Sequence, residues 1–255
     1  LNEILEISKV SRKKSIENSK RIKIENNNIV GSLALKGGLI DDISFKKYKQ
    51  DLKSDKNIQF LNPAQTENGF YVETGWTSIG NKIKVPTKDS IWNANGNNII
   101  NNGKPVLLQW DNGEGILFKK KIELDDRYLF KITQQVQNNT KNQVDLYPYA
   151  QITRNKIPED IQNFYISHEG FIGVFNEELK EDDYDDVQEK KIIREANEGW
   201  MGITDKYWMT AIVPKKGENF KSTFLYKNAF KVNYILNNLV ILYKAQLIHD
   251  LKKVL

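Results

Sequence analysis

The 255-residue chain contains no cysteine and only two histidines, His168 and His249. The absence of cysteine excludes disulfides, thiolate metal sites and cysteine nucleophiles. Two histidines are too few for a histidine-rich metal cluster. No stretch approaches the roughly 20 apolar residues of a membrane-spanning helix, and no signal-peptide pattern opens the chain. We therefore expect the chain as given to be a soluble piece with none of these chemistries.

Motifs that bind phosphate or activate a serine are also missing. Gly113-Glu114-Gly115 lacks the third glycine of a phosphate-binding loop, and the segment around Ser78 lacks the first glycine of a nucleophile elbow. His168-Glu169 begins like a zinc-protease motif, but no second histidine follows. We expect no cofactor and no metal. A pair of carboxylates acting on a glycoside stays open, because any two of the 33 acidic residues could meet in the fold.

The net charge of +5 is unevenly distributed. Residues Glu177–Glu189 contain eight acids and one base, a local charge of −7, so the remainder carries +12. The basic residues are scattered and form no long block, which favours a lysine-rich solvated surface over a nucleic-acid interface. The acidic stretch lacks the alternating ligands and central glycine of a calcium loop, and we expect a solvated loop or short helix there.

Short apolar runs separated by turn signals fill the chain from Arg21 onward. Along Tyr128–Val136 apolar residues alternate with polar ones, the period of a half-buried strand. Asn-Gly, which suits tight hairpin turns, occurs at 68–69, 95–96, 102–103 and 112–113. This pattern predicts an all-β fold, a large antiparallel sandwich. We expect one domain over residues 21–255.

The two ends of the chain are less regular. Residues 1–20 are polar and charge-mixed, and we expect a tether or a short helix. Near the other end, Leu236, Val240, Tyr243, Leu247 and Leu251 fall at near-helical spacing, which predicts an amphipathic helix. The run Leu239–Leu242 fits a strand equally well.

Two groups of residues are candidates for a site. His168 and Glu169 could act as acid and base on a sugar, but neighbours on a strand point to opposite faces, so a turn-stabilising role for His168 is favoured. The decapeptide Gly199–Trp208 is the more distinctive group. Its candidate residues, for a structural motif or a ligand cleft, are Trp200, Gly202, Asp205, Lys206, Tyr207 and Trp208. Because aromatic side chains carry large buried areas, we expect the two tryptophans in the core, with a cost of about 3–5 kcal/mol on truncation to alanine.

The decapeptide and further segments, in the same order, resemble the large periplasmic domain of the bacterial membrane-protein insertase YidC. That family carries a G-W-x-G-I-T-D-K-Y-W run, followed by a short apolar strand and a proline, as in Ala211–Pro214 here. The other matching segments are Ser32–Asp42 with Tyr48 shortly after, Phe70–Trp76, Leu108–Gly115 and Ile166–Gly170. The matches extend from about Arg21 to Pro214.

The resemblance implies a β-supersandwich, similar to galactose mutarotase-like domains, without catalysis. It implies a parent protein in the inner membrane with one membrane helix before Leu1 and others after Leu255. This domain would then lie on the periplasmic side. The parent inserts and folds membrane proteins, alone or with the Sec translocon, so the implied partners are Sec accessory subunits and nascent membrane proteins. The family also has a glycine-containing stretch leading into a helix, and His249–Leu255 departs from it by lacking the glycine.

Two other functions remain open from the sequence. The same fold could carry a carbohydrate-binding module or an aldose-epimerase-like enzyme, which would need His168 and Glu169 to converge in a cleft. A free-standing interaction module of the cell envelope is the third reading.

Overall fold

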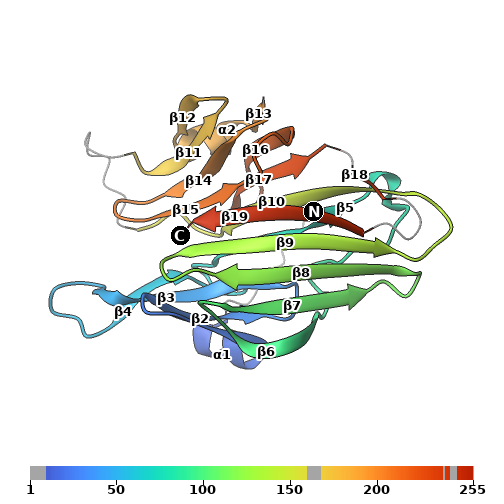
Figure 1. Ribbon diagram of the computed structural model, residues 1–255. Helices are drawn as coiled ribbons and strands as arrows, with labels where there is room; N and C mark the ends of the chain where they lie inside the picture. The colour runs from blue at the N-terminus through green and yellow to red at the C-terminus, as the bar shows by residue number, and fades with distance from the viewer. Residues whose placement is uncertain (1–9, 160–167, 238, 242–245, 255) are drawn as a thin grey trace, which may run out of the picture.

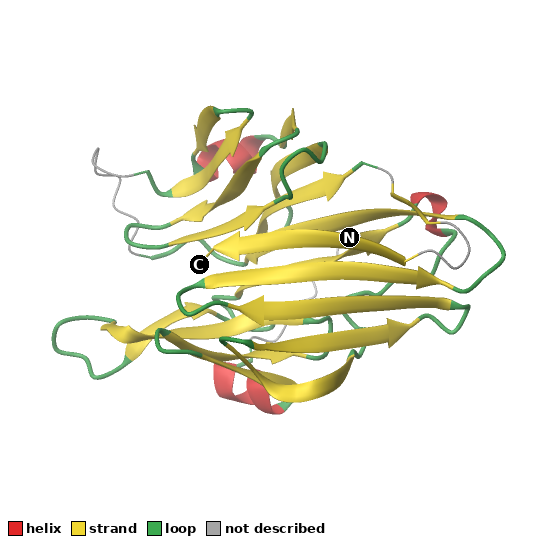
Figure 2. Cartoon of the chain, viewed as in Figure 1, coloured by secondary structure: helices red, strands yellow, loops and turns green. Residues whose placement is uncertain are grey.

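Strands dominate the computed structural model, which describes residues 10–159, 168–237, 239–241 and 246–254 (Figure 2). They form two antiparallel layers that face each other across a common interior (Figure 1). The predicted all-β sandwich is therefore confirmed.

The first sheet contains strands from both halves of the chain. Its hydrogen-bonded order is β13 (Ile192–Ala196), β16 (Phe220–Tyr226), β17 (Phe230–Leu236), β10 (Val144–Arg154), β5 (Phe70–Thr77), β3 (Leu39–Lys49), β2 (Ile29–Ala34) and β1 (Arg21–Glu25). Strand β4 (Asn57–Leu61) pairs with the distal part of β3, and β18 (Leu239–Ile241) pairs with the start of β10.

The second sheet faces the first. Its order is β12 (Glu178–Asp182), β11 (Gly170–Phe175), β14 (Gly199–Thr204), β15 (Met209–Val213), β19 (Gln246–Val254), β9 (Leu129–Asn138), β8 (Ile116–Leu124), β7 (Lys104–Asp111) and β6 (Asn93–Asn101). A parallel pairing of β1 with β6 joins the two sheets at one edge.

Helices are short in the described part of the chain. They are α1 (Arg12–Glu17), α2 (Tyr184–Glu189) and the 3₁₀ turn η1 (Ile79–Asn81). No helix among the described residues is long and apolar enough to cross a membrane. Helix α1 lies inside the polar segment 1–20, whose first nine residues are outside the described part.

The near-helical spacing toward the C-terminus corresponds to strands, not to a helix. Strand β18 takes the place of the predicted run Leu239–Leu242, and β19 pairs along nine residues of β9. The position Tyr243 lies outside the described residues. Pairing with β9 and β15 on both sides outweighs the weak helical pattern, because tertiary context overrides propensity.

Strand β9 shows how the sequence period produces the core. Phe130, Ile132 and Val136 are buried, as their alternation predicts. Gln134 lies on the same parity and is buried too. The interior between the sheets also holds Trp76 and Trp92, stacked with ring centroids 6.5 Å apart.

Asn68-Gly69 lies in the turn before β5, where the Gly69 N–H donates to the Thr66 carbonyl at 3.1 Å. The other three Asn-Gly pairs lie in or next to β6, β7 and β8. Asn102-Gly103 is the two-residue turn of the β6–β7 hairpin, and Gly103 has a φ of 77°, which glycine adopts without strain. Asn112-Gly113 lies in the β7–β8 turn. Asn95-Gly96, in contrast, lies within β6, and the register with β7 shifts only after it. The prediction of a turn at 95–96 is therefore wrong, because Asn95 and Gly96 pair with Leu107 and Val106 of β7.

Candidate functional site

The decapeptide Gly199–Trp208 forms strand β14 and the turn that leads to β15. Gly202 is buried at a close approach of the two strands, where an added Cβ would lie 2.2 Å from the Thr210 carbonyl oxygen. The turn is closed by the Asp205 N–H, which donates to the Trp208 carbonyl at 2.7 Å. Gly202 and the Asp205 turn therefore have a structural role, because they set the distance between β14 and β15.

Trp208 anchors the turn to the first sheet. Its ring centroid lies 4.3 Å from that of Phe45 and 4.6 Å from that of Tyr48, both on β3. Trp208 and Trp200 are only half-buried, whereas Trp76 and Trp92 are 2% and 1% exposed. The expectation that the two tryptophans of the decapeptide form the centre of the core is therefore wrong, since they lie at its margin.

The rest of the turn is exposed. Tyr207 is 74% exposed, and the Lys206 ammonium group lies 5.3 Å from the centre of its ring. Neither side chain points into the interior, so these two candidate residues belong to the surface.

Asp205 belongs to a polar cluster between the sheets that the sequence did not reveal. Its carboxylate accepts a hydrogen bond from Arg154 Nη1, at the end of β10, at 2.6 Å. The Arg154 guanidinium also stacks 4.6 Å from the centre of the Phe70 ring. Burial opposes the charge of Arg154, but Tyr184 and Asp205 outweigh it and raise the pKa of the guanidinium. Burial also raises the pKa of the Tyr184 hydroxyl.

His168 and Glu169 have separate surroundings. His168 Nε2 lies 2.8 Å from the Phe171 carbonyl oxygen, and Nδ1 lies 3.6 Å from Asp183 Oδ1. The charge of Glu169 acts on Tyr184, and its Oε2 atom is buried without a hydrogen-bond partner in the described part of the chain. Thus the charge of Glu169 acts on Tyr184 of the Arg154 cluster, whereas His168 contacts the backbone at the start of β11.

A second buried polar group lies around Lys120 on β8. The Lys120 Nζ donates to the Thr74 carbonyl at 2.6 Å and lies 4.5 Å from the centre of the Trp92 ring. Complete burial, partly offset by Glu73, lowers the pKa of Lys120 to about 7. Burial also raises the pKa of the Glu73 carboxyl. One sequence signal was available, since Lys120 has the inward parity of Phe118 and Ile122.

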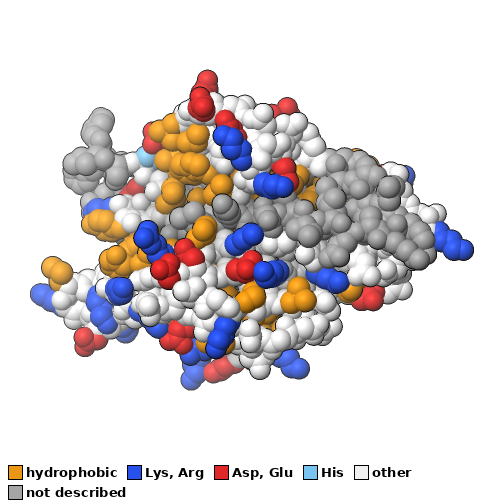
Figure 3. Space-filling view, in the orientation of Figure 1, with side chains coloured by type: hydrophobic (Ala, Val, Ile, Leu, Met, Phe, Trp, Pro, Cys, Tyr) orange, Lys and Arg blue, Asp and Glu red, His pale blue; other side chains and the backbone are white. Residues whose placement is uncertain are grey.

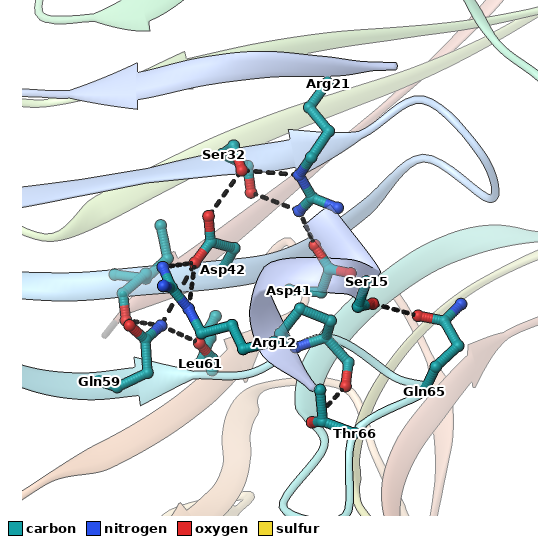
Figure 4. Close-up of polar contacts among 12 residues, drawn as sticks. Arg12, Ser15, Arg21, Ser32, Asp41, Asp42, Gln59, Leu61, Gln65 and Thr66 are labelled. Carbon is teal, nitrogen blue, oxygen red and sulfur yellow. Dashed lines mark hydrogen bonds and ion pairs between the residues drawn. The ribbon is translucent and has the colours of Figure 1, made fainter. Parts of the chain in front are cut away.

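Helix α1 is fixed to the outside of the first sheet by a third polar network (Figure 4). Arg12 binds Asp42 on β3, and Ser15 Oγ donates to Gln65 Oε1 at 2.8 Å. The neighbouring carboxyl of Asp41 binds Arg21, and burial raises its pKa. These contacts attach the polar N-terminal segment to the sandwich.

The acidic stretch Glu177–Glu189 consists of β12 and helix α2. A capping box starts the helix: the Asp183 side chain accepts from the N3 backbone, and the Asp186 side chain accepts from the Asp183 N–H. No group of three acidic or histidine side chains with the spacing of a metal site is found within the described residues. The acids of this stretch thus serve the local fold and the surface.

Two hollows lie in the surface formed by the described residues. One is lined by Asn176, Asn197, Asn219 and Asn237, and another by residues 101–105 and the start of β9. Neither is lined by a candidate residue predicted from the sequence. The residues of the decapeptide take part in packing and in an ion pair.

Solved structures with the same architecture define the class of the fold. A galactose mutarotase related enzyme from Lactobacillus acidophilus matches with a TM-score of 0.62 and 11% identity, covering 92% of this chain and 97% of its own. A putative aldose 1-epimerase from Escherichia coli K12 matches with a TM-score of 0.56 and 6% identity, covering 92% and 98%. At such low identity the likeness shows the fold alone: a galactose mutarotase-like β-sandwich.

Sequence comparison gives the family. The model of the YidC periplasmic domain matches residues 21–247. A membrane protein insertase YidC of Pelagibacter ubique is 44% identical over 228 residues, which cover 89% of this chain and 41% of that protein. The corresponding protein of Rickettsia canadensis is 41% identical over 209 residues, covering 81% and 37%. The chain belongs to the YidC periplasmic domain family, and it spans about two fifths of the length of these relatives.

Proposed function

We propose that the chain is a non-catalytic periplasmic domain of an inner-membrane insertase and that it assists the insertion and folding of membrane proteins by contacting other proteins. The family match over residues 21–247 carries this proposal. The insertase name of relatives up to 44% identical supports it. Nascent membrane proteins and accessory subunits of the Sec translocon are the proposed partners, and no cofactor or nucleic acid is needed.

The domain organisation that we propose is a single sandwich over residues 21–255 preceded by a polar segment, 1–20. The contacts of α1 with the first sheet support a segment that is packed against the sandwich. In the parent protein this segment would lead from the membrane into the domain.

A sugar-converting enzyme would need free acidic and basic side chains. In the polar clusters these side chains have structural partners instead. Asp205 is engaged by Arg154, and His168 by a backbone carbonyl and Asp183. An acid and a base must reach one substrate together. Because His168 is engaged by the Phe171 carbonyl, whereas the charge of Glu169 acts on Tyr184, an aldose-epimerase-like activity gains no support from this geometry.

The edge formed by β12 and β13 is the protein-contact surface that we favour. Each is an edge strand among the described residues: β12 pairs with β11 in the second sheet, and β13 pairs with β16 in the first. Leu179 on β12 and Ile193 on β13 are 55% and 45% exposed. Exposed edge strands can accept an added strand from a partner, and apolar side chains there add buried area.

Photocrosslinking in the intact parent protein tests this function. A photoreactive amino acid is placed at Leu179 or Ile193, with Lys141 in the exposed β9–β10 loop as the control position. We expect crosslinks to nascent membrane proteins or Sec subunits from the two edge positions and not from Lys141. An absence of such crosslinks at both edge positions, with the parent present in normal amount, would contradict the proposal.

A further inference from the structure

The β3–β4 hairpin projects from one end of the sandwich (Figure 1). Its tip is an ordered turn: the Gln50 N–H donates to the Lys56 carbonyl at 3.0 Å, and the Lys53 N–H donates to Asp51 Oδ1 at 2.8 Å. Leu52, held in this turn, is fully exposed. An exposed leucine side chain contributes favourable free energy only when contact with an apolar partner removes it from water.

Aromatic residues lie beside the hairpin. Tyr48, near the end of β3, is 43% exposed, and Tyr207 in the β14–β15 turn is 74% exposed. The contact between Trp208 and Tyr48 joins that turn to the hairpin, so the two exposed tyrosines belong to one end of the molecule. Tyrosine and tryptophan, with an apolar ring and a polar tip, are enriched where water meets lipid.

The same end is basic. Residues 46–56 contain five lysines and two aspartates, a net charge of +3, and Lys206 adds another lysine beside Tyr207. Lysine and arginine side chains, with some acidic ones among them, lie around the hydrophobic side chains at this end of the molecule (Figure 3). Lysine is depleted in protein–protein interfaces, whereas lysines around isolated apolar anchors are typical of a surface that meets anionic lipid.

We propose that this end, the hairpin face, defined by Tyr48, Leu52, Lys53, Lys56 and Tyr207, docks on an anionic lipid bilayer. Leu52 would enter the boundary between headgroups and acyl chains, and the lysines would face the lipid phosphates. Its setting in the cell rests on the proposed function, which places the domain next to a membrane. The contact would fix how the sandwich, and with it the β12–β13 edge, is held above that membrane.

Vesicle flotation with the 255-residue chain tests the hairpin face. The probes are vesicles of phosphatidylcholine alone and of phosphatidylcholine with 30% phosphatidylglycerol, at about 50 and about 300 mM NaCl, concentrations at which screening differs. We expect flotation with the anionic vesicles, weakened by salt, and little with the neutral ones. Each lysine near an anionic surface contributes about a fivefold change in binding, so Lys53→Gln with Lys56→Gln should weaken binding about 25-fold.

Matched variants separate docking from general effects. Leu52→Asp should reduce anionic-vesicle binding at least about tenfold, since it replaces the apolar anchor by a like charge to the lipid. Ile79→Asp, at an exposed apolar residue in η1, and Lys82→Gln with Lys141→Gln, in exposed loops at the other end of β5 and β10, should bind like the unmodified chain. Circular dichroism verifies that each variant is folded.

Equal flotation with both vesicle types, no flotation, or the same loss in the controls would overturn the inference. Self-association abolished by Leu52→Asp, without vesicle binding, would assign the face to a second copy and overturn it too. Crosslinking from the β12–β13 edge does not depend on these residues. Failure of one experiment is therefore distinguishable from failure of the other.

Discussion

Lys120 is a lysine buried in the interior, where a charged side chain is rarely found. Strand β5 pairs with β10 on one side, but its pairing with β3 is limited to Val72 with Ile40. The carbonyls that follow receive side-chain donors from the second sheet, Lys120 at Thr74 and Gln134 at Gly75. A buried carbonyl without a donor costs about 1–3 kcal/mol, which explains why a lysine is tolerated there.

A pH dependence of stability follows from this position. The folded chain lowers the pKa of Lys120 to about 7, so above that pH the unfolded state binds more protons than the folded state. Stability should therefore rise with pH, by about 2 kcal/mol between pH 7 and pH 9. Urea unfolding at these two pH values measures the rise.

The variant Lys120→Met removes the titrating group and should abolish that rise. It also leaves the Thr74 carbonyl without its donor, so the comparison concerns the change with pH and not the stability at one pH. Lys119→Met, at the neighbouring half-buried lysine, is the control that should keep the rise. A rise that persists in Lys120→Met would show that another group causes it.

Asp205 gives a second prediction at this scale. Its side chain is 26% exposed and that of its partner Arg154 is 13% exposed, so Asp205→Asn leaves a largely buried cation with a weaker partner. We expect a loss of about 1–3 kcal/mol in the free energy of unfolding, measured in urea. Asp89→Asn, which breaks the exposed pair with Lys36, should cost less than about 0.5 kcal/mol. Equal losses of unfolding free energy in the two variants would contradict a stabilising role of the Arg154–Asp205 ion pair.

Among the elements, the β14–β15 turn links the two sheets. Trp208 contributes aromatic packing against β3, and Asp205 contributes an ion pair with β10. A turn held by both kinds of contact fixes the end of the sandwich that also carries the β3–β4 hairpin. Because Trp208 is only half-buried, we expect it to contribute less to the free energy of unfolding than a core tryptophan does.

Truncation of the aromatic residues in this turn should follow their burial. Trp208→Ala should lower the free energy of unfolding by about 2–3 kcal/mol, less than the full cost of a buried tryptophan. Tyr207→Ala, at the 74% exposed neighbour, should stay within about 0.5 kcal/mol. Equal losses in thermal or urea unfolding would mean that the packing with Phe45 and Tyr48 is not what stabilises the turn.

Hydrophobic alternation and turn dipeptides predicted the strands and turns correctly where local sequence preferences agree with the tertiary structure. The alternation along β9 and the turn at Asn102-Gly103 are such cases. At Asn95-Gly96 the same dipeptide lies inside strand β6, paired with β7, and toward the C-terminus a near-helical spacing forms strands. Both outcomes depend on pairing with strands distant in the sequence, which no local window contains.

At the scale of the whole molecule, the fold class and the family were predictable, but the clusters were not. Ordered segments from Arg21 to Pro214 carried the family resemblance, and the family match over residues 21–247 bears it out. The meeting of Arg154, Tyr184 and Asp205 depends on how β10, α2 and the β14–β15 turn pack. Sequence spacing does not encode that packing, so the cluster became visible only in three dimensions.

The fold itself leaves the function undecided, because the same sandwich occurs in proteins named mutarotase related enzyme and aldose 1-epimerase. The function therefore depends on how the acidic and basic side chains are used. Here Arg154, Asp205 and His168 are held by internal partners, in agreement with the proposed non-catalytic role.

The proposed non-catalytic role can be tested by polarimetry, which follows the rate at which freshly dissolved α-galactose or α-glucose anomerises with and without the folded chain. We expect the same rate in both samples and no effect of Glu169→Gln. An acceleration that Glu169→Gln removes would show that the cluster performs acid–base chemistry on a sugar and would contradict the non-catalytic role.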